Sequence, residues 1–338
     1  INYQEGMGDM RDKADRLQKL TEAIGKDWGF TAEEAADADR AAFLSKSDLA
    51  TGMVTEFTEL QGEMGKEYAL LDGEKPEVAK AIFEQYMPRF AGDILPEQEI
   101  GRALSLADKL DNLAATFLRG LIPTGSQDPF ALRRQTIGAV NILTDGKIHW
   151  DIRRGIEAAL ALLPGDEETK KTVLSQIEDF FRQRIKAIML DEGIAYDIID
   201  AVLAGPVDDI YALFLKARSM AESQLKDEAE LRQAVTRLAN ITKGKTGGKV
   251  DPSLFTEDVE KKLQDAFEAV SAKALPLFAS YEYGKALPAL KELTAPINDY
   301  LDNVMVMVDD EAVKNNRISQ LLATLALFNT WGDFSKLV

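Results

Sequence analysis

Residues 123–134, which read Pro-Thr-Gly-Ser-Gln-Asp-Pro-Phe-Ala-Leu-Arg-Arg, decide how the middle of this chain folds. Asp128 stands directly before Pro129, and Asp followed by Pro suits the N-cap and the first position of a helix. The apolar residues that follow recur at helical offsets of seven and eleven: Leu132, Ala139 and Leu143. The pattern therefore predicts an irregular connection over residues 123–129 that leads into a helix beginning at Pro129.

Arg133 and Arg134 lie beside this apolar stripe, in the early turns of the predicted helix. The helix dipole does not favour cations there. A pair of arginines in this position indicates either a partner carboxylate or phosphate, or simply a solvated pair. Both interpretations stay open at the level of sequence.

Length and composition describe an ordinary globular chain. The 338 residues are 46% hydrophobic and 29% charged, which is enough for two or three domains with real cores. We expect a soluble protein, since no run approaches the length of a membrane span and the N-terminus does not read as a signal peptide. There is no cysteine, which excludes disulfides and thiolate metal sites and fits a cytoplasmic location.

The net charge is −17, from 40 basic and 57 acidic residues. Such a balance argues against nucleic-acid binding, because phosphates favour clustered Lys and Arg. The argument concerns the average, however, and a local basic patch can override it.

Apolar residues recur at helical spacing along almost the whole chain, and no period-two strand pattern is convincing. The fold class predicted is therefore all-α. The principal helices expected are Arg11–Gly25, Lys46–Gly62, Val78–Tyr86, Gly101–Leu118, Ile210–Leu225, Glu228–Ile241 and Asp310–Asn329. Four methionines at apolar positions are expected to pack in the core: Met53, Met64, Met305 and Met307.

Residues able to do chemistry are scarce. His149 is the only histidine, and we expect it to pack beside Trp150 rather than to act in catalysis. No Gly-x-Ser-x-Gly elbow presents a serine, and Gly244-Lys245-Thr246 lacks the glycine and preceding strand of a phosphate-binding loop. No catalytic residue is predicted.

Basic residues gather in one part of the C-terminal third. Between Lys216 and Lys249 there are eight Lys/Arg and four acids, a local charge of +4 (8 − 4). Three of these lysines share one glycine-rich loop: Lys243, Lys245 and Lys249. Glycines allow a backbone to approach a phosphate closely, although a solvated surface loop is an equally good interpretation.

Four stretches carry a family resemblance. They are Lys46–Gly65, Ser105–Leu113, Pro123–Arg134 and Val304–Leu322. In this order they resemble the C-terminal half of the beta subunit of the bacterial two-subunit glycyl-tRNA synthetase. The chain opens inside what resembles an HD-like domain, so we expect the family's N-terminal half to be missing.

The resemblance implies three parts: an HD-like helical domain at residues 1–140, a helical connector at 141–206, and a DALR-type anticodon-binding helical domain at 207–338. Asp111 stands where the HD superfamily keeps its last metal-ligand aspartate, and Asp48 and Asp108 are the other aspartates considered for a metal. The histidine ligands of that superfamily have no counterpart here. No bound metal is therefore expected.

What the resemblance implies for function is a tRNA-binding, non-catalytic part of glycine–tRNA ligase. Its C-terminal domain would hold the anticodon arm of tRNA-Gly. The alpha subunit would activate and transfer glycine with ATP and Mg, in an alpha2-beta2 assembly, and this part would bind no cofactor, membrane or DNA. The tRNA-binding candidates are Arg133, Arg134, Arg218, Arg237, Asn240, Lys243, Lys245, Lys249 and Arg317. The alternative is a divergent HD-type nucleotide phosphohydrolase with a helical regulatory tail.

Overall fold

The computed structural model describes all 338 residues and contains sixteen α-helices and no β-strand, so the all-α prediction is confirmed. The first nine are α1 Met10–Trp28, α2 Ala32–Leu44, α3 Gly52–Glu56, α4 Glu63–Leu71, α5 Pro76–Glu84, α6 Glu99–Leu118, α7 Leu132–Asp145, α8 Ile152–Ala161 and α9 Glu167–Asp191. The others are α10 Tyr196–Val202, α11 Ile210–Glu222, α12 Ala229–Thr242, α13 Asp258–Ala279, α14 Leu287–Lys291, α15 Thr294–Asn303 and α16 Glu311–Asn329. No helix is both long and apolar enough to span a membrane.

The chain divides into two compact units. Unit 1 comprises residues 1–185 and 207–211, and unit 2 comprises residues 186–206 and 212–338. Helix α9 therefore begins in unit 1 and ends in unit 2. The three-part division at residues 140 and 206 stays a prediction.

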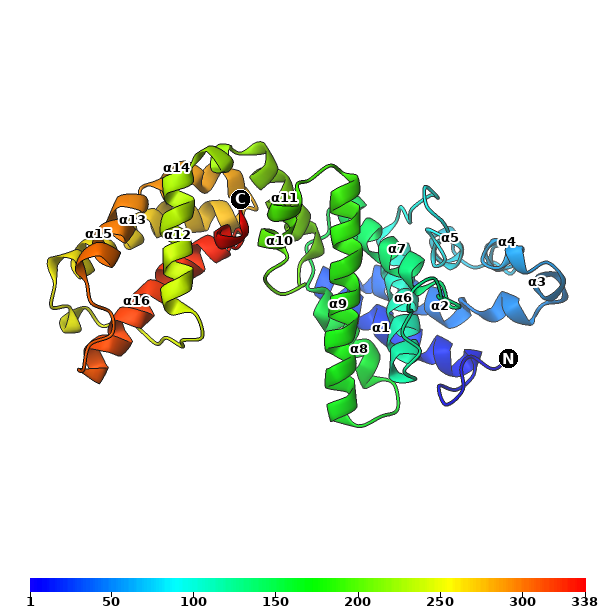
Figure 1. The fold of residues 1–338 in the computed structure, drawn as a ribbon. Helices are drawn as coiled ribbons and strands as arrows, with labels where there is room; N and C mark the ends of the chain where they lie inside the picture. Colours follow the sequence, from blue (N-terminus) through cyan, green and yellow to red (C-terminus); the bar gives the residue numbers. More distant parts are fainter. The chain divides into compact units, whose positions relative to one another are not determined.

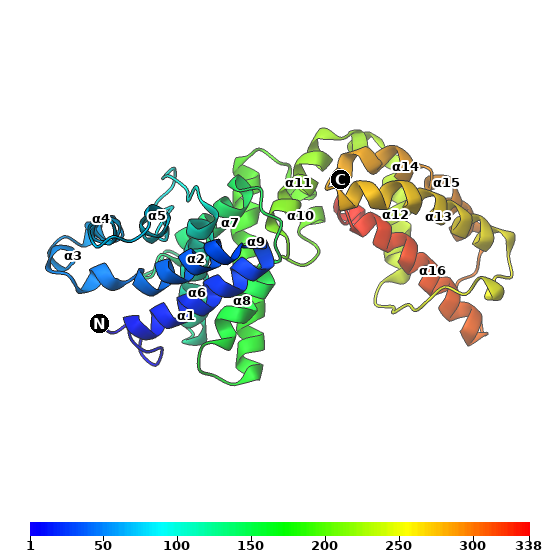
Figure 2. The same cartoon turned by 180° about the vertical axis from the view of Figure 1, so that it is seen from behind.

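Unit 1 is built around α6, which packs against α1, α2, α5, α7 and α8 (Figures 1 and 2). Nearly every residue of α6 is buried, including Leu106, Leu110, Leu113 and Phe117. Because α6 is covered on all sides, its charged residues are buried as well. Asp108 and Asp111 thus lie inside the unit and not on a solvated face.

The prediction of one helix over residues 46–62 is wrong. This segment is a 3₁₀ turn at Ser47–Ala50, the short helix α3, a second 3₁₀ turn at Thr58–Leu60, and then α4. The cause is Asp48, whose Oδ2 accepts hydrogen bonds from the backbone N–H groups of Gly62 (2.6 Å) and Gly65 (3.0 Å). That contact folds the segment back on itself and caps α4, because a carboxylate is favourable at a helix N-terminus.

Helix α7 begins at Leu132 and not at Pro129 as predicted. Ala131 precedes it in the left-handed region at φ 53°, so the Asp-Pro pair lies in the connection. Asp128 nevertheless caps the helix: Oδ1 accepts from the N–H of Leu132 (2.8 Å) and Oδ2 from that of Arg133 (3.0 Å). The irregular connection and the capping aspartate were predicted correctly, whereas the start of the helix was predicted three positions too early.

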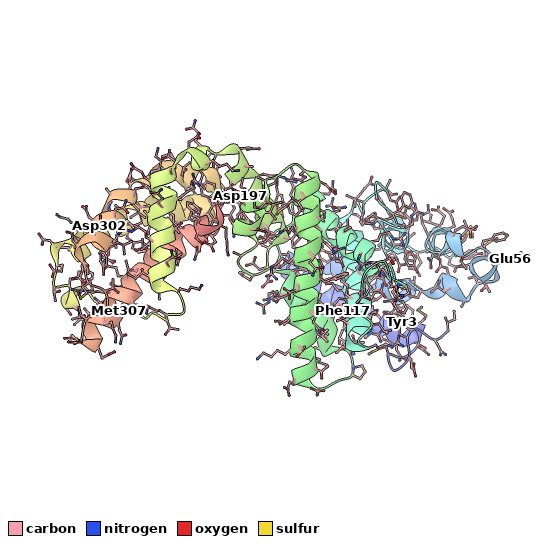
Figure 3. The ribbon with its side chains drawn as sticks, viewed as in Figure 1. Tyr3, Glu56, Phe117, Asp197, Asp302 and Met307 are labelled. Carbon is pink, nitrogen blue, oxygen red and sulfur yellow. The ribbon has the colours of Figure 1, made fainter.

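Unit 2 places α12, α13, α15 and α16 against one another around large buried aromatic side chains, among them Tyr300, Phe328 and Trp331. Figure 3 marks Asp302 on α15 and Met307 in the link between α15 and α16. In that link Val304 and Val306 are buried, while Met305 is 73% exposed and Met307 47%. The prediction that these two methionines pack in the core is wrong, and Met53 is exposed too.

Candidate nucleic-acid interface

Helix α12 presents a row of polar side chains on its exposed side. Arg237 and Asn240 are both exposed and, three positions apart, lie on the same helical face. The Arg237 guanidinium pairs with the Asp302 carboxylate of α15 at 2.6 Å and donates to Asn298 at 2.9 Å. These contacts fix the position of Arg237 while leaving it at the surface.

The same row continues toward the N-terminus of α12. Arg232, Gln233, Thr236 and Arg237 line a surface cavity of about 400 Å³ together with Leu337. Arg232, Gln233 and Thr236 were not among the residues predicted for this site. The available signal was the spacing of three from Gln233 to Thr236 and of four from Arg232 to Thr236 and from Gln233 to Arg237, because residues three or four apart share one helical face.

The loop Thr242–Lys249 follows α12 directly and is fastened to α16. The N–H of Gly248 donates to the Ser319 hydroxyl (2.8 Å), and Asn316 exchanges hydrogen bonds with the backbone of Asp251 (2.7 and 2.9 Å). A Cβ on Gly247 would lie 3.0 Å from Leu322 and 3.2 Å from the Ser319 backbone. Gly247 thus allows the loop to approach α16 closely, and the loop is a held surface element.

The three lysines of this loop form no ion pair with an acidic side chain, although hydrogen bonds from Ser253 and, to a lesser extent, the charge of Lys249 lower the pKa of Asp251. Lys243 and Lys249 are exposed and Lys245 is half-buried. None of the ion pairs of the chain includes any of them, although 57 acidic residues are available. Their ammonium groups are free to meet an external anion.

Arg218 lies on a different helix from the other unit 2 candidates. It lies on α11, half-buried, and forms a two-point contact with Glu192 at 3.0 and 2.8 Å. Arg218 therefore has an ion-pair partner in Glu192, whereas the loop lysines have none.

Arg317 is buried, which disfavours the contact with tRNA that was predicted for it. Its side chain is 5% exposed and donates to Glu260 (3.0 Å), the Met305 carbonyl (2.7 Å) and the Thr256 hydroxyl (2.7 Å). Burial alone would raise the pKa of Glu260, but Arg317 and two backbone N–H groups more than offset burial and lower that pKa. Arg317 holds α16, α13 and the preceding link together.

Cationic side chains of the chain itself pair with the aspartates at the HD-like position. Asp111 is held by Lys13 at 2.8 Å and Arg16 at 2.6 Å, and Asp108 by Lys13 at 3.2 Å and Lys46 at 3.0 Å. Burial would raise the pKa of Asp108, yet the lysines lower it, so the carboxylate stays charged. Two ammonium groups and a guanidinium at these carboxylates do not fit a divalent metal ion, which needs unpaired oxygen or nitrogen ligands.

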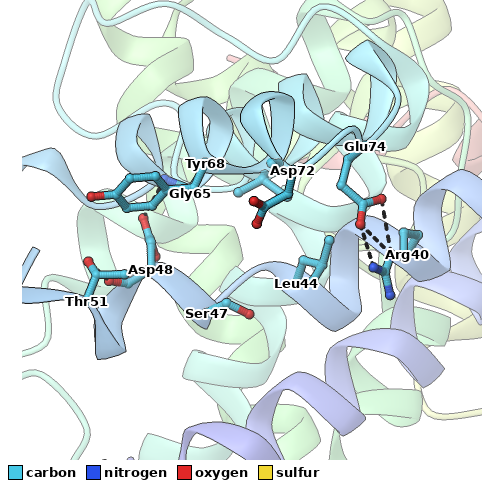
Figure 4. A pocket seen from close by; sticks show the side chains of 11 residues that line it. Arg40, Leu44, Ser47, Asp48, Thr51, Gly65, Tyr68, Asp72 and Glu74 are labelled. Atoms are coloured by element: carbon cyan, nitrogen blue, oxygen red, sulfur yellow. Dashed lines mark hydrogen bonds and ion pairs between the residues drawn. The ribbon is translucent and has the colours of Figure 1, made fainter.

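Asp48 lines a separate cavity of about 580 Å³ with Ser47, Thr51, Tyr68 and Asp72 (Figure 4). Arg40, also in its wall, is paired with Glu74. The remaining lining residues are acidic or neutral. Such a wall repels a phosphate, so this cavity is no part of a nucleic-acid interface.

His149 lies apart from the HD-like aspartates. Its Nδ1 is 2.7 Å from Asp209 and its ring stacks near Tyr211, while Trp150 donates instead to Asp27. Trp150 was the predicted neighbour of His149, but His149 contacts Asp209 and Tyr211 instead.

Arg133 and Arg134 are brought together at the start of α7. Arg134 is exposed and Arg133 half-buried, and both line a cavity of about 390 Å³ that also contains Phe90 and Asn141. Asp128 is the only acid in its wall, and both of its carboxylate oxygens accept hydrogen bonds from the N-terminus of α7. This cavity belongs to unit 1, whereas α12 and its loop belong to unit 2.

The fold and these surfaces define a class of protein: an all-helical chain with an anticodon-binding module. Residues 231–332, which include most of α12, the lysine loop and α16, match the DALR anticodon binding domain. Residues 1–204 match the glycyl-tRNA synthetase beta subunit. The chain belongs to the glycyl-tRNA synthetase beta subunit family.

Individual relatives agree along the whole chain. It is 44% identical to the glycine–tRNA ligase beta subunit of Clostridioides difficile over 339 residues, and 41% identical to that of Desulforamulus reducens over 342 residues. The subunit of Haemophilus influenzae is 40% identical over 340 residues. All of this chain is covered in each case, and it spans 49% of the length of each relative.

Proposed function

We propose that this chain is a tRNA-binding, non-catalytic part of the beta subunit of glycine–tRNA ligase, and that unit 2 holds the anticodon arm of tRNA-Gly. The observation that carries the proposal is the match of residues 231–332 to an anticodon-binding domain whose α12 ends in a loop with three unpaired lysines. In a chain of charge −17, such a local excess of cations favours a polyanion at this place.

Within the interface the residues divide by chemistry. Lys243, Lys245 and Lys249 carry long flexible ammonium groups, which grip phosphates without reading bases. Arg237 is oriented by Asp302 and Asn298, and Asn240 lies on the same face of α12. Oriented planar groups suit the edges of unpaired bases, so Arg237 and Asn240 are the proposed specificity residues.

The proposal extends to the assembly. Glycine activation with ATP and Mg and the transfer step belong to an alpha subunit, in an alpha2-beta2 enzyme of the cytoplasm. This chain is proposed to bind no metal at its HD-like position, because Lys13, Lys46 and Arg16 pair with the carboxylates there. The same ion pairs disfavour the phosphohydrolase alternative.

The test compares tRNA-Gly with a tRNA of different anticodon. We expect Arg237→Met and Asn240→Ala to weaken tRNA-Gly binding and to reduce the preference over the second tRNA. Removing one base contact should cost roughly 1–3 kcal/mol of discrimination, the range known for base-edge contacts. A matched control is Lys273→Met, which removes another surface cation of unit 2 that has an acidic partner, Glu292. Equal affinities of all variants for both tRNAs would contradict the assignment.

A further inference from the structure

Two adjoining cavities in unit 1 form a basic and aromatic depression distinct from the α12 surface. The first, about 390 Å³, is lined by Arg133, Arg134 and Asn141. The second, about 470 Å³, is lined by Arg89, Lys109 and Gln135. Phe90 and Arg134 belong to both, so the two cavities meet at these side chains. Their size is that of a pocket for a small ligand or a single nucleotide.

The cations here outnumber the acids able to neutralise them. Arg133 and Arg134 have no acidic partner for their side chains, and Asp128 is engaged by the N-terminal N–H groups of α7. In the second cavity Asp108 is paired with Lys13 and Lys46. Arg89 is itself paired with Asp93 at 2.8 Å, so the unpaired arginines of the two cavities are Arg133 and Arg134. Glu59 is the one remaining acid of these walls. Together the two cavities attract an anion.

A third arginine strengthens this charge. Arg184 of α9 has Arg133 and Asp128 as its charged neighbours, and its Nε is buried without a hydrogen-bond partner. Burial and the repulsion from Arg133 lower the pKa of Arg184, although Asp128 acts in the opposite direction. Like charges held close together are stabilised when an anion binds between them.

An aromatic ring lies at the junction of the cavities. Phe90 is 53% exposed, and the Arg89 guanidinium lies 5.7 Å from the centre of its ring. An exposed aromatic ring next to arginines is the combination on which unpaired bases stack while their phosphates are held. Amide side chains at Gln135 and Asn141 supply donors and acceptors for a base edge.

We infer that this depression, named here the Phe90 site and comprising Arg89, Phe90, Arg133, Arg134, Gln135 and Asn141, binds an unpaired nucleotide of an RNA strand. The phosphate lies on Arg133 and Arg134, and the base stacks on Phe90. The inference adds a second RNA-binding site, in unit 1, to the proposed function and rests on that function for the identity of the RNA.

The test uses the full chain and an unstructured RNA hexamer of uridine, with uridine monophosphate and inorganic phosphate as separate probes. We expect the double variant R133Q/R134Q to bind the hexamer more weakly and to lower the slope of log affinity against log salt by about 0.7 for each phosphate that is no longer bound. Phe90→Ala should weaken binding about tenfold and leave that slope unchanged, because stacking involves no counterion release. The matched control K19Q/K171Q removes two exposed charges of unit 1 outside the site.

Equal hexamer affinity of R133Q/R134Q and of the control would overturn the inference. So would equal affinity for uridine monophosphate and the hexamer, because the ligand would then be a free nucleotide. Thermal melting of each variant shows that it is folded. The effect of the loop lysines on tRNA-Gly binding is measured independently, so failure at the Phe90 site is distinguishable from failure of the proposed function.

Discussion

Arg317 of α16 donates through Nε to Oε1 of Glu260 on α13 at 3.0 Å, and neither side chain is accessible to solvent beyond 5%. A buried pair of this kind is costly to break from one side, because the partner is left as an unpaired buried charge. The pair therefore fixes the surface on which the loop Thr242–Lys249 rests, since Asn316 and Ser319 of α16 anchor that loop.

We predict that Arg317→Met lowers the free energy of unfolding of unit 2 by about 3–5 kcal/mol. Lys314→Met on the same helix is the control. Its partner Glu311 is exposed, so this change should cost no more than about 1 kcal/mol. Urea denaturation measures both. The pKa of Glu260 is lowered in the folded state, so the stabilisation is present above its usual pKa of 4.5 and is lost as the pH falls below that value. Wild-type-like stability of Arg317→Met would contradict this role.

Glu84 makes stability depend on pH in the opposite direction to Glu260. It is buried, two backbone N–H groups bond to Oε2, and burial raises its pKa to about 7. Between pH 4.5 and 7 the folded state binds the proton more tightly than the unfolded state, so stability should fall as the pH rises, by up to about 3 kcal/mol. Glu84→Gln should lack this slope, whereas the exposed Glu77→Gln should retain it. The test compares the unfolding free energies of wild type and of both variants at about pH 5 and about pH 8, which lie on either side of most of this titration. Parallel pH profiles for Glu84→Gln and wild type would refute the prediction.

Asp128 caps α7 from four residues before its first turn. Replacing it with alanine leaves the N–H groups of Leu132 and Arg133 unpaired, so Asp128→Ala should cost about 0.5–2 kcal/mol of stability. Asp128→Asn, which keeps one acceptor oxygen, should recover part of the stability. Thermal or urea unfolding measures the series. An alanine variant as stable as wild type would show that the cap contributes nothing.

Gly247 and Gly248 provide a matched pair in the lysine loop. A Cβ on Gly247 would contact Leu322 and the Ser319 backbone, whereas a Cβ on Gly248 meets nothing within 4 Å. Gly247→Ala should therefore loosen the loop from α16 and cost about 1–3 kcal/mol, the usual range for overpacking, and Gly248→Ala should be nearly neutral. Hydrogen exchange of the Gly248 amide, which donates to Ser319, reports the loosening directly. Equal protection in both variants would contradict it.

The amphipathic helices were predictable from the sequence because each has one buried face, as α12 illustrates. The segment at residues 46–62 was not, because the contact from Asp48 to Gly62 and Gly65 spans 14 and 17 residues and periodicity carries no information about it. The burial of Asp108, Asp111 and Arg317 was not predictable for a related reason. A charged residue is expected at the surface, and only its partners Lys13, Lys46, Arg16 and Glu260 make burial possible.

The exposed lysines of the loop were predictable, since glycine-rich polar segments lie at the surface. The cavities around Phe90 were not, because they bring together residues 88–91 and 131–141, which a linear pattern does not connect.

The most direct test of the account is the salt dependence of tRNA-Gly binding by the variant K243A/K245A/K249A. If each lysine meets one phosphate, the slope of log affinity against log salt should fall by about 0.7 per lysine, roughly 2 in all, with all tRNAs weakened about equally. The control K261A/K262A/K336A removes three other exposed lysines of unit 2 and should keep the wild-type slope. An unchanged affinity and slope for the loop variant would contradict the claim that this loop holds tRNA.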